Sequence, residues 1–117
     1  MALTAAVGLS ACADKRREPR DLTGADPARG LQLIEATGCA ACHVIPGVRW
    51  PRGQVGGSLE GFGARTLIAG RTPNQPDALV AFLRDPAATQ PGGAMPSTPL
   101  SETQLRDVAA YLYTLDD

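Results

Sequence analysis

The stretch GCAACHVIPG, residues 38–47, sets two cysteines three positions apart and places the only histidine of the chain, His43, directly after the second. Two thiols and an imidazole at such short spacing can hold one group together. Three chemistries use side chains of this kind: a metal site, a redox-active disulfide and covalent haem attachment. The rest of the sequence decides among them.

Covalent haem gives a role to all three side chains. Cys-x-x-Cys-His is a signature of c-type haem attachment. Thiols separated by two residues, here Cys39 and Cys42, can reach two neighbouring vinyl groups on one edge of the porphyrin. The next residue, His43, then turns its neutral imidazole under the iron, for which imidazole is a good axial ligand. We therefore predict one covalently bound haem c.

The other two chemistries leave residues unexplained. A structural zinc site needs four ligands, and beyond these three side chains the sequence offers Cys12 and no second histidine. A thioredoxin-like pair stands at a helix N-terminus in a βαβ context, whereas this pair follows the end of a predicted helix and no strands are predicted. A structural disulfide is compatible with export but gives His43 no role.

The sixth ligand of a haem iron has one internal methionine to draw on, Met95, because Met1 lies in the leader. A lone methionine is often core filling. Met95, however, stands in QPGGAMPSTPL, residues 90–100, between Ala94 and Pro96 in a loop rather than on a helical stripe. This placement favours a side chain held out to a ligand.

Helical patterns are expected over residues 27–37, 76–85 and 101–115. Asp26 is a good N-cap for the first, Pro86 stops the second, and SETQ from Ser101 to Gln104 is a capping box for the third. Residues 44–75 are rich in Gly and Pro and are expected to be mostly loop, with ARTLIAG, residues 64–70, compatible with a short helical turn. An all-α domain follows.

The N-terminus resembles the end of a secretory signal, because residues 1–11 are uncharged and mostly apolar or small. LSAC, residues 9–12, resembles a bacterial lipobox, in which Cys12 becomes the lipidated first residue after cleavage. Residues 12–26 are highly charged and are expected to form a solvated tether to that lipid anchor. We therefore expect a protein of the bacterial cell envelope, lipid-anchored on the periplasmic or extracytoplasmic side, in contact with the membrane through this anchor only.

The charges nearly balance, with 11 basic and 12 acidic residues, and give no indication of a nucleic-acid partner. The segment before Met95, AATQPGGA, carries no charge. Any basic face is therefore expected on residues 44–75, which hold one acid, Glu60, against Arg49, Arg52, Arg65 and Arg71. These arginines and Trp50 are also candidates to contact the haem or its propionates.

From Pro27 to Leu115 the sequence resembles the class I c-type cytochromes, which are monohaem proteins. The blocks that carry the resemblance are GCAACH, LVAFLRDPAATQPGGAMP and LSETQLRDVAAYLYTL. With RTLIAGRTPNQPDALVAFLRDP, the middle block is most similar to the cytochrome c domain fused to subunit II of some haem–copper oxidases. The resemblance implies a small cytochrome c fold over residues 27–117, with three main helices and long loops around one haem.

The resemblance also implies roles by position. Cys39 and Cys42 would form the thioethers, with His43 and Met95 as the two axial ligands. Gly30 and Ile34 would meet Tyr111 and Leu112 where the first and last helices cross. Three residues depart from the family's usual choice: Gly57 for a proline whose carbonyl accepts from the histidine ligand, Phe82 for a Tyr or Trp facing the haem, and Gly93 for a Thr or Asn.

The function that this implies is one-electron transfer, because two protein ligands fill the iron and leave no position for substrate. We expect a monomeric carrier and no enzyme, with a quinol-oxidising complex or dehydrogenase as donor and a terminal oxidase as acceptor. One alternative is a permanently bound haem c subunit of an oxidase or dehydrogenase complex. Another is a haem enzyme or sensor with a labile Met95.

Overall fold

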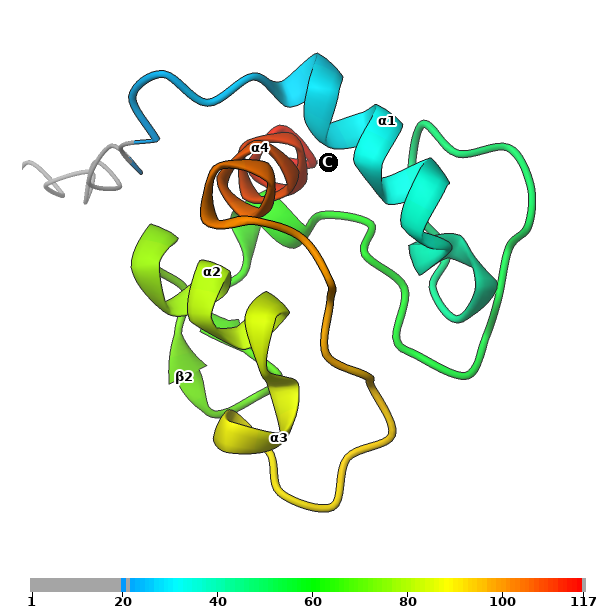
Figure 1. Cartoon of the computed structure of the whole chain (residues 1–117). Coiled ribbons are helices and arrows are strands. Elements are labelled where there is room, and N and C mark those ends of the chain that lie inside the picture. Colours follow the sequence, from blue (N-terminus) through cyan, green and yellow to red (C-terminus); the bar gives the residue numbers. More distant parts are fainter. Residues whose placement is uncertain (1–19, 21, 117) are drawn as a thin grey trace, which may run out of the picture.

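Four α-helices joined by long loops make up the part of the chain that the structure, a computed structural model, describes: residues 20 and 22–116 (Figure 1). The helices are α1 (Pro27–Thr37), α2 (Pro76–Arg84), α3 (Pro86–Thr89) and α4 (Glu102–Tyr113). Two single 3-10 turns, η1 (Cys39–Ala41) and η2 (Phe62–Ala64), and two antiparallel strands of two residues, β1 (Leu67–Ile68) and β2 (Thr72–Pro73), complete the described elements. The small, mainly helical fold that the sequence predicts is confirmed.

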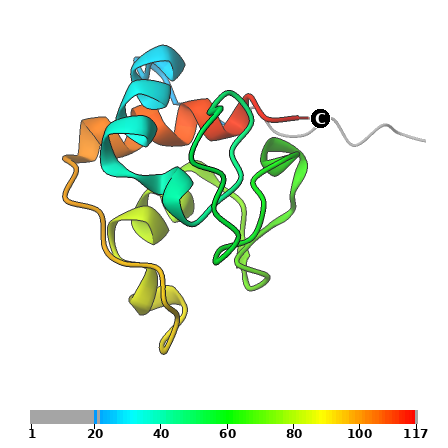
Figure 2. The same ribbon diagram turned by 90° about the vertical axis from the view of Figure 1, so that its right-hand side faces the viewer.

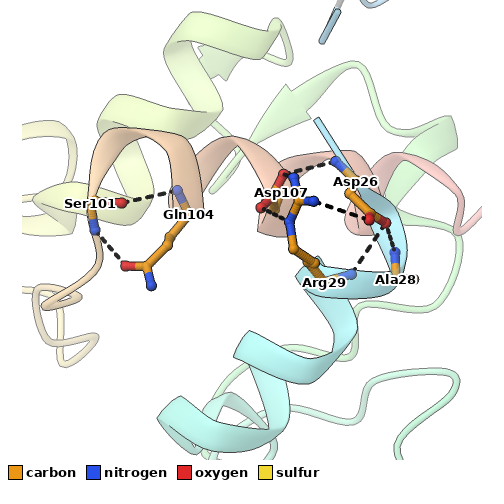
Figure 3. A network of polar contacts seen from close by, with 6 residues as sticks. All are labelled: Asp26, Ala28, Arg29, Ser101, Gln104 and Asp107. Carbon is orange, nitrogen blue, oxygen red and sulfur yellow. Dashed lines mark hydrogen bonds and ion pairs between the residues drawn. The ribbon is translucent and has the colours of Figure 1, made fainter. Parts of the chain in front are cut away.

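The helix ends follow the signals in the sequence. The Asp26 side chain accepts from the backbone N–H groups of Ala28 and Arg29 and so caps α1. Gly38 ends α1 in the left-handed conformation, at φ 78°, and turns the chain directly into η1. At the start of α4, Ser101 and Gln104 form the predicted capping box, with both hydrogen bonds present (Figure 3).

The first and last helices cross closely, and Figures 1 and 2 show α1 lying against α4. Gly30 makes the approach possible, because a Cβ at this position would overlap the backbone carbonyl of Asp107 and lie 3.1 Å from Cβ of Tyr111. The predicted role of Gly30 is thereby confirmed. Ile34 is fully buried one turn further along α1.

A buried carboxylate joins the same two helices (Figure 3). Asp107, only 2% exposed, accepts from the backbone N–H of Asp26 at 2.8 Å and from Nε of Arg29 at 3.0 Å. The hydrogen bond from Arg29 is the main cause that lowers the pKa of Asp107 below its ordinary value. One side chain of α4 thus stabilises the first turn of α1. The sequence pattern placed only apolar residues at this crossing.

The core beneath the crossing is mostly aliphatic, with Phe62 as its aromatic member, and draws on α1, α2 and α4 as well as on the loops. Its most deeply buried members are Ile34, Ile45, Ile68, Leu79, Val80 and Leu105. Leu105, Val108, Ala109 and Leu112 are all buried, as their helical spacing predicts. On α2, Leu79 and Leu83 are buried too, whereas Phe82 is only half-buried.

Two local predictions differ from the structure. Residues 64–70 do not form a helical turn of their own: η2 ends at Ala64, and Leu67–Ile68 pair with Thr72–Pro73 as a short hairpin. A left-handed Ala69 and Gly70, at φ 49° and 69°, make the tight turn that allows this pairing. Pro86 stops α2 as predicted, but it also begins α3, because proline suits the first position of a helix.

Arg20 and Leu22 lie in the segment predicted as a solvated tether, yet both contact the folded domain. Arg20 donates to the carbonyls of Gly63 at 2.6 Å and Arg65 at 2.9 Å. Its guanidinium also stacks 4.4 Å above the ring of Tyr113. Leu22 packs against the core. The packed part of the chain therefore begins before Pro27.

Tyr113 is held from its other end as well. Its hydroxyl donates to Oδ1 of the buried Asn74 at 3.0 Å, and Nδ2 of Asn74 donates to the carbonyl of Arg65 at 3.1 Å. Burial raises the pKa of Tyr113 to about 12. These bonds fasten the segment after η2 to the C-terminal end of α4.

The predictions for residues 1–11 and for Cys12 fall outside the residues that the structure describes. Among residues 20 and 22–116, no helix combines the length and the apolar character that a membrane crossing requires.

Candidate haem site

A cavity of about 530 Å³ lies between the helices and the loops. The Cys-x-x-Cys-His segment supplies one part of its wall with Cys39, Cys42 and His43, and the loop before α4 supplies another with Met95. Most of the remaining lining is apolar, including Ile34, Ile45, Leu59, Leu79, Phe82, Leu83, Leu100, Leu105, Val108 and Leu112. The structure therefore brings together the four residues that the sequence singled out for haem, from segments far apart in the chain.

His43 is oriented by a backbone acceptor. Its Nδ1 lies 2.6 Å from the carbonyl oxygen of Gly57, as expected from the family pattern despite the absence of the proline. A hydrogen bond from Nδ1–H to that carbonyl fixes the neutral tautomer and leaves Nε2 with its lone pair available. A lone pair on Nε2 is what an axial ligand requires.

Gly56 packs directly against the imidazole, a contact that sequence reasoning missed. A Cβ at this position would lie 2.7 Å from Nδ1 and 2.8 Å from Nε2 of His43, closer than any side chain can approach. At Gly57, by contrast, a Cβ would meet nothing within 4 Å. The two adjacent glycines thus differ: Gly56 leaves room for the ring, whereas Gly57 holds it through its carbonyl.

Backbone hydrogen bonds hold the following loop onto the Cys-x-x-Cys-His segment. Gly53 N–H donates to the carbonyl of Ala40 at 2.9 Å, and Gly56 N–H donates to that of Cys42 at 2.7 Å. Gly53 sits so close that a Cβ would overlap the Ala41 carbonyl. The loop is also tied to α4, because the hydroxyl of Tyr111 donates to the carbonyl of Pro46 at 2.5 Å. A chain without regular structure is thereby given a fixed position around His43.

The two cysteines lie just after α1, and no disulfide joins them. Cys39 and Cys42 are both free thiols, each partly exposed. Sγ of Cys39 lies 3.6 Å from the hydroxyl of Thr37. Because η1 follows α1 at once, the two thiols are presented at the end of a fixed helix rather than on a free loop.

Met95 is half-buried and belongs to a loop with little regular structure. Phe82 lines the same cavity from α2, and Gly93 lines it from the Met95 loop. Thr98, on the far side of Met95, donates its hydroxyl to the carbonyl of Leu83 and so joins this loop to the end of α2. Contacts of this kind set where Met95 stands in the wall.

The predicted haem-side arginines and Trp50 divide into two groups. Arg65 lines the cavity and donates to the carbonyls of Ser58 and Glu60. Trp50 does not line it, and its side chain is 83% exposed. Arg49 and Arg52 border a separate hollow of about 260 Å³ instead, and Arg71 borders neither. The structure thus brings Arg65 and Phe82 to the cavity and leaves Trp50 outside it.

The comparisons with known proteins agree with this geometry. The model of the family described as "Cytochrome c" matches residues 27–116. The chain belongs to the cytochrome c family. It is also similar to cytochrome c oxidase subunit 2 of Alkalihalophilus pseudofirmus, with 34% identity over 88 residues. That match covers 74% of this chain but 25% of the relative, so the chain spans about a quarter of that protein's length.

Membership in the family gives this cytochrome c its cofactor, one covalent haem c. The residues of the cavity fit that group. The same cavity is lined by the thiols of Cys39 and Cys42, the imidazole of His43 and the thioether of Met95. The rest of the lining is mostly apolar, which suits the face of a porphyrin. Within residues 20 and 22–116, no three His, Cys, Asp or Glu side chains cluster as they would around a bare metal ion.

Proposed function

We propose that this protein is a monohaem one-electron carrier that delivers electrons to a terminal oxidase. The observation that carries the proposal is that His43 and Met95 line one cavity, with Nδ1 of His43 held by the carbonyl of Gly57. These two side chains would ligate the iron of a haem bound there. The domains of this family typically carry electrons. The likeness to an oxidase subunit supports an oxidase as the acceptor.

In this proposal each residue has a defined task. Cys39 and Cys42 would hold the haem through thioethers, and His43 and Met95, which line the same cavity, would ligate its iron. The bound haem supplies a one-electron couple at its iron, with a potential that a Met/His ligand pair raises. Gly57 keeps the His43 ring in one orientation, and Gly56 leaves room for it.

The apolar wall has a task of its own. Side chains such as Leu79, Leu83, Leu105 and Val108 would keep water away from the haem iron. An apolar surrounding of this kind favours the reduced haem, which carries less positive charge than the oxidised haem. The residues that line the cavity include no Asp or Glu that could serve as an acid or base beside His43, which fits electron transfer rather than acid–base catalysis. The catalytic chemistry then belongs to the partners.

Replacement of Met95 tests the ligation. Met95→Ala should open the sixth position, create binding of carbon monoxide and lower the reduction potential. The measurement is a redox titration with optical spectra, with and without carbon monoxide. Thr103→Ala, on the exposed side of α4 and outside the cavity lining, is the control and should behave as the wild type. Unchanged spectra in Met95→Ala would show that Met95 only fills space, and strong carbon monoxide binding by the wild type would favour an enzyme or sensor.

A second candidate is a permanently bound haem c subunit of an oxidase or dehydrogenase complex. It is favoured by the relative, in which a matching region belongs to a much longer oxidase subunit. Gentle extraction of membranes followed by size separation distinguishes the two. A carrier should migrate alone as a monomer, whereas a subunit should comigrate with its complex.

We further propose a lipid anchor on Cys12, which would place the protein on the periplasmic or extracytoplasmic side of the bacterial cell envelope. The support is the LSAC motif after an uncharged leader. Wild-type protein should fractionate with membranes, and Cys12→Ala should be released or poorly processed. Mass spectrometry that finds an unmodified Cys12 in the native protein would contradict the anchor.

A further inference from the structure

The loop that follows the haem motif displays the two most exposed large hydrophobic side chains among the described residues. Trp50 is 83% exposed and Val55 82%. A single exposed apolar residue is ordinary on a protein surface, but a tryptophan exposes a large apolar area. Val55 lines the cavity, where the haem would cover it, so its exposure needs no partner. Trp50 lines no part of the cavity and does not pack against the core, so its exposure needs another explanation.

The loop is a fixed platform for these side chains. The bonds from Gly53 and Gly56 to the carbonyls of Ala40 and Cys42 hold it on the haem motif. Surfaces that are already ordered lose little conformational entropy on association. Trp50 therefore stands on an ordered loop, which suits a side chain that contacts a partner.

Charge indicates the kind of surface that would cover Trp50. Arg49 and Arg52 flank it, both are exposed, and within the described residues neither forms an ion pair or a hydrogen bond. Unpaired arginines around a tryptophan are the composition of a protein interface hot spot. A complementary surface would offer an apolar recess with carboxylates along its rim.

The position of the loop connects this surface to the cofactor site. Val55 lines the cavity although it is largely exposed, so the loop reaches from the surface to the cavity wall. Gly53 touches the backbone at Ala41 and Cys42. A partner bound at Trp50 would thus lie close to the haem motif, because Gly53, three residues after Trp50, is hydrogen-bonded to Ala40 between the two cysteines.

We infer that residues 49–55 form the docking surface for the redox partner, with Trp50 seated in an apolar recess of that partner and Arg49 and Arg52 paired with carboxylates at its rim. The inference rests on the proposed function as an electron carrier. Tryptophan and arginine also favour the interface of a lipid bilayer. A lipid surface on this loop would, however, cover the side of the molecule that backs directly onto the haem motif.

The test compares two oxidants of the reduced full-length protein with Cys12→Ala as the background, so that the anchor plays no part. One oxidant is a purified cytochrome c oxidase, and the other is ferricyanide, which needs no protein interface. Trp50→Ala should slow the second-order reaction with the oxidase at least tenfold, since central aromatic contacts dominate interfaces. Its reaction with ferricyanide should stay within about twofold, because so exposed a side chain contributes little to the fold.

Leu67→Ala is the matched control, because Leu67 is an exposed hydrophobic residue on β1 and lines no part of the cavity. It should leave both rates within about twofold of the background. Arg52→Glu, which places an acid beside the carboxylates of the partner, should also slow the reaction with the oxidase and thus tests the rim separately.

The outcomes are distinct. If the background protein reacts with the oxidase and Trp50→Ala reacts equally fast, the docking surface is wrong and the carrier function stands. If the background protein reacts with ferricyanide but not with the oxidase, the delivery step of the proposed function is overturned, together with the partner inferred here. Sedimentation with vesicles of anionic phospholipid that is lost in Trp50→Ala would assign the loop to a lipid surface instead.

Discussion

The α1–α4 crossing and the loop wall around His43 hold their residues in place by different means. At the crossing, two regular helices meet over Gly30, and Asp107 joins them through three donors. Around His43, a loop rich in glycine packs closely against the haem motif. Single hydrogen bonds to backbone groups fix the position of this loop and the orientation of the His43 ring. The comparison indicates that the crossing carries the fold, whereas the loop wall carries the function and depends more on the cofactor.

Removal of the covalent attachment should have the largest effect. Cys39→Ala together with Cys42→Ala should abolish covalent haem and leave the chain largely unfolded, because haem fills the centre of a small domain with a thin core. Haem staining of a denaturing gel and far-ultraviolet circular dichroism measure both results. Haem stain that survives in the double variant would break the assignment of the motif.

Gly30→Ala tests the crossing without touching the cofactor. The new methyl group would overlap the Asp107 carbonyl, so the helices must move apart, and we expect a loss of about 3 kcal/mol in the free energy of unfolding. Denaturant unfolding of the haem-loaded protein measures it. Gln32→Ala, on the exposed side of the same helix, should change stability by less than about 0.5 kcal/mol. Equal stabilities would mean that the crossing is not the close contact described.

Two adjacent glycines beside His43, Gly56 and Gly57, allow a matched comparison of substitutions. Gly56→Ala should press on the His43 ring, cost about 1–3 kcal/mol and change the visible spectrum and the potential, because the axial ligand is displaced. Gly57→Ala should leave the spectrum unchanged, since its Cβ meets nothing within 4 Å and the carbonyl remains. Identical spectra for Gly56→Ala and the wild type would contradict the close fit of the ring.

The smallest effect is expected from Asp107→Asn, and it should depend on pH. The folded pKa of Asp107 is lowered, so its contribution to stability is present above the unfolded pKa of about 3.9 and is lost as the pH falls through the lower folded value. Near neutral pH the variant should be less stable by about 1–2 kcal/mol. At a pH below both values the difference should vanish, because wild-type Asp107 is then neutral too. A difference that persists there would assign the effect to packing rather than to charge.

Local signals in the sequence were enough to predict the helices. Asp26 with Pro27, and Ser101 with Gln104, mark helix starts by hydrogen bonds within four residues, and the apolar spacing from Leu105 to Leu112 defines the buried face. The Cys-x-x-Cys-His motif is equally local, and the placement of Met95 on the same cavity followed from the family pattern.

What the sequence did not predict depends on partners far along the chain. The buried carboxylate of Asp107 is paired with Arg29, which lies 78 positions away in the sequence. Gly56 cannot carry a side chain because the ring of His43 packs against it. Trp50, a candidate to contact the haem, is exposed, although Val48 two positions before it is buried. Such contacts leave no periodic trace in the sequence, so only the folded structure reveals them.

The hydrogen bonds of Arg20 shorten the linker that would join the folded domain to the proposed lipid anchor. Between Cys12 and Pro27 an extended chain spans about 50 Å, but between Cys12 and Arg20 it spans about 28 Å. With Arg20 fixed to Gly63, Arg65 and Tyr113, only the shorter length would separate the folded domain from the proposed lipid anchor. The accessible volume then falls roughly sixfold, and the local concentration that a membrane-bound oxidase encounters rises by the same factor. A single arginine would in this way tune how often carrier and oxidase meet.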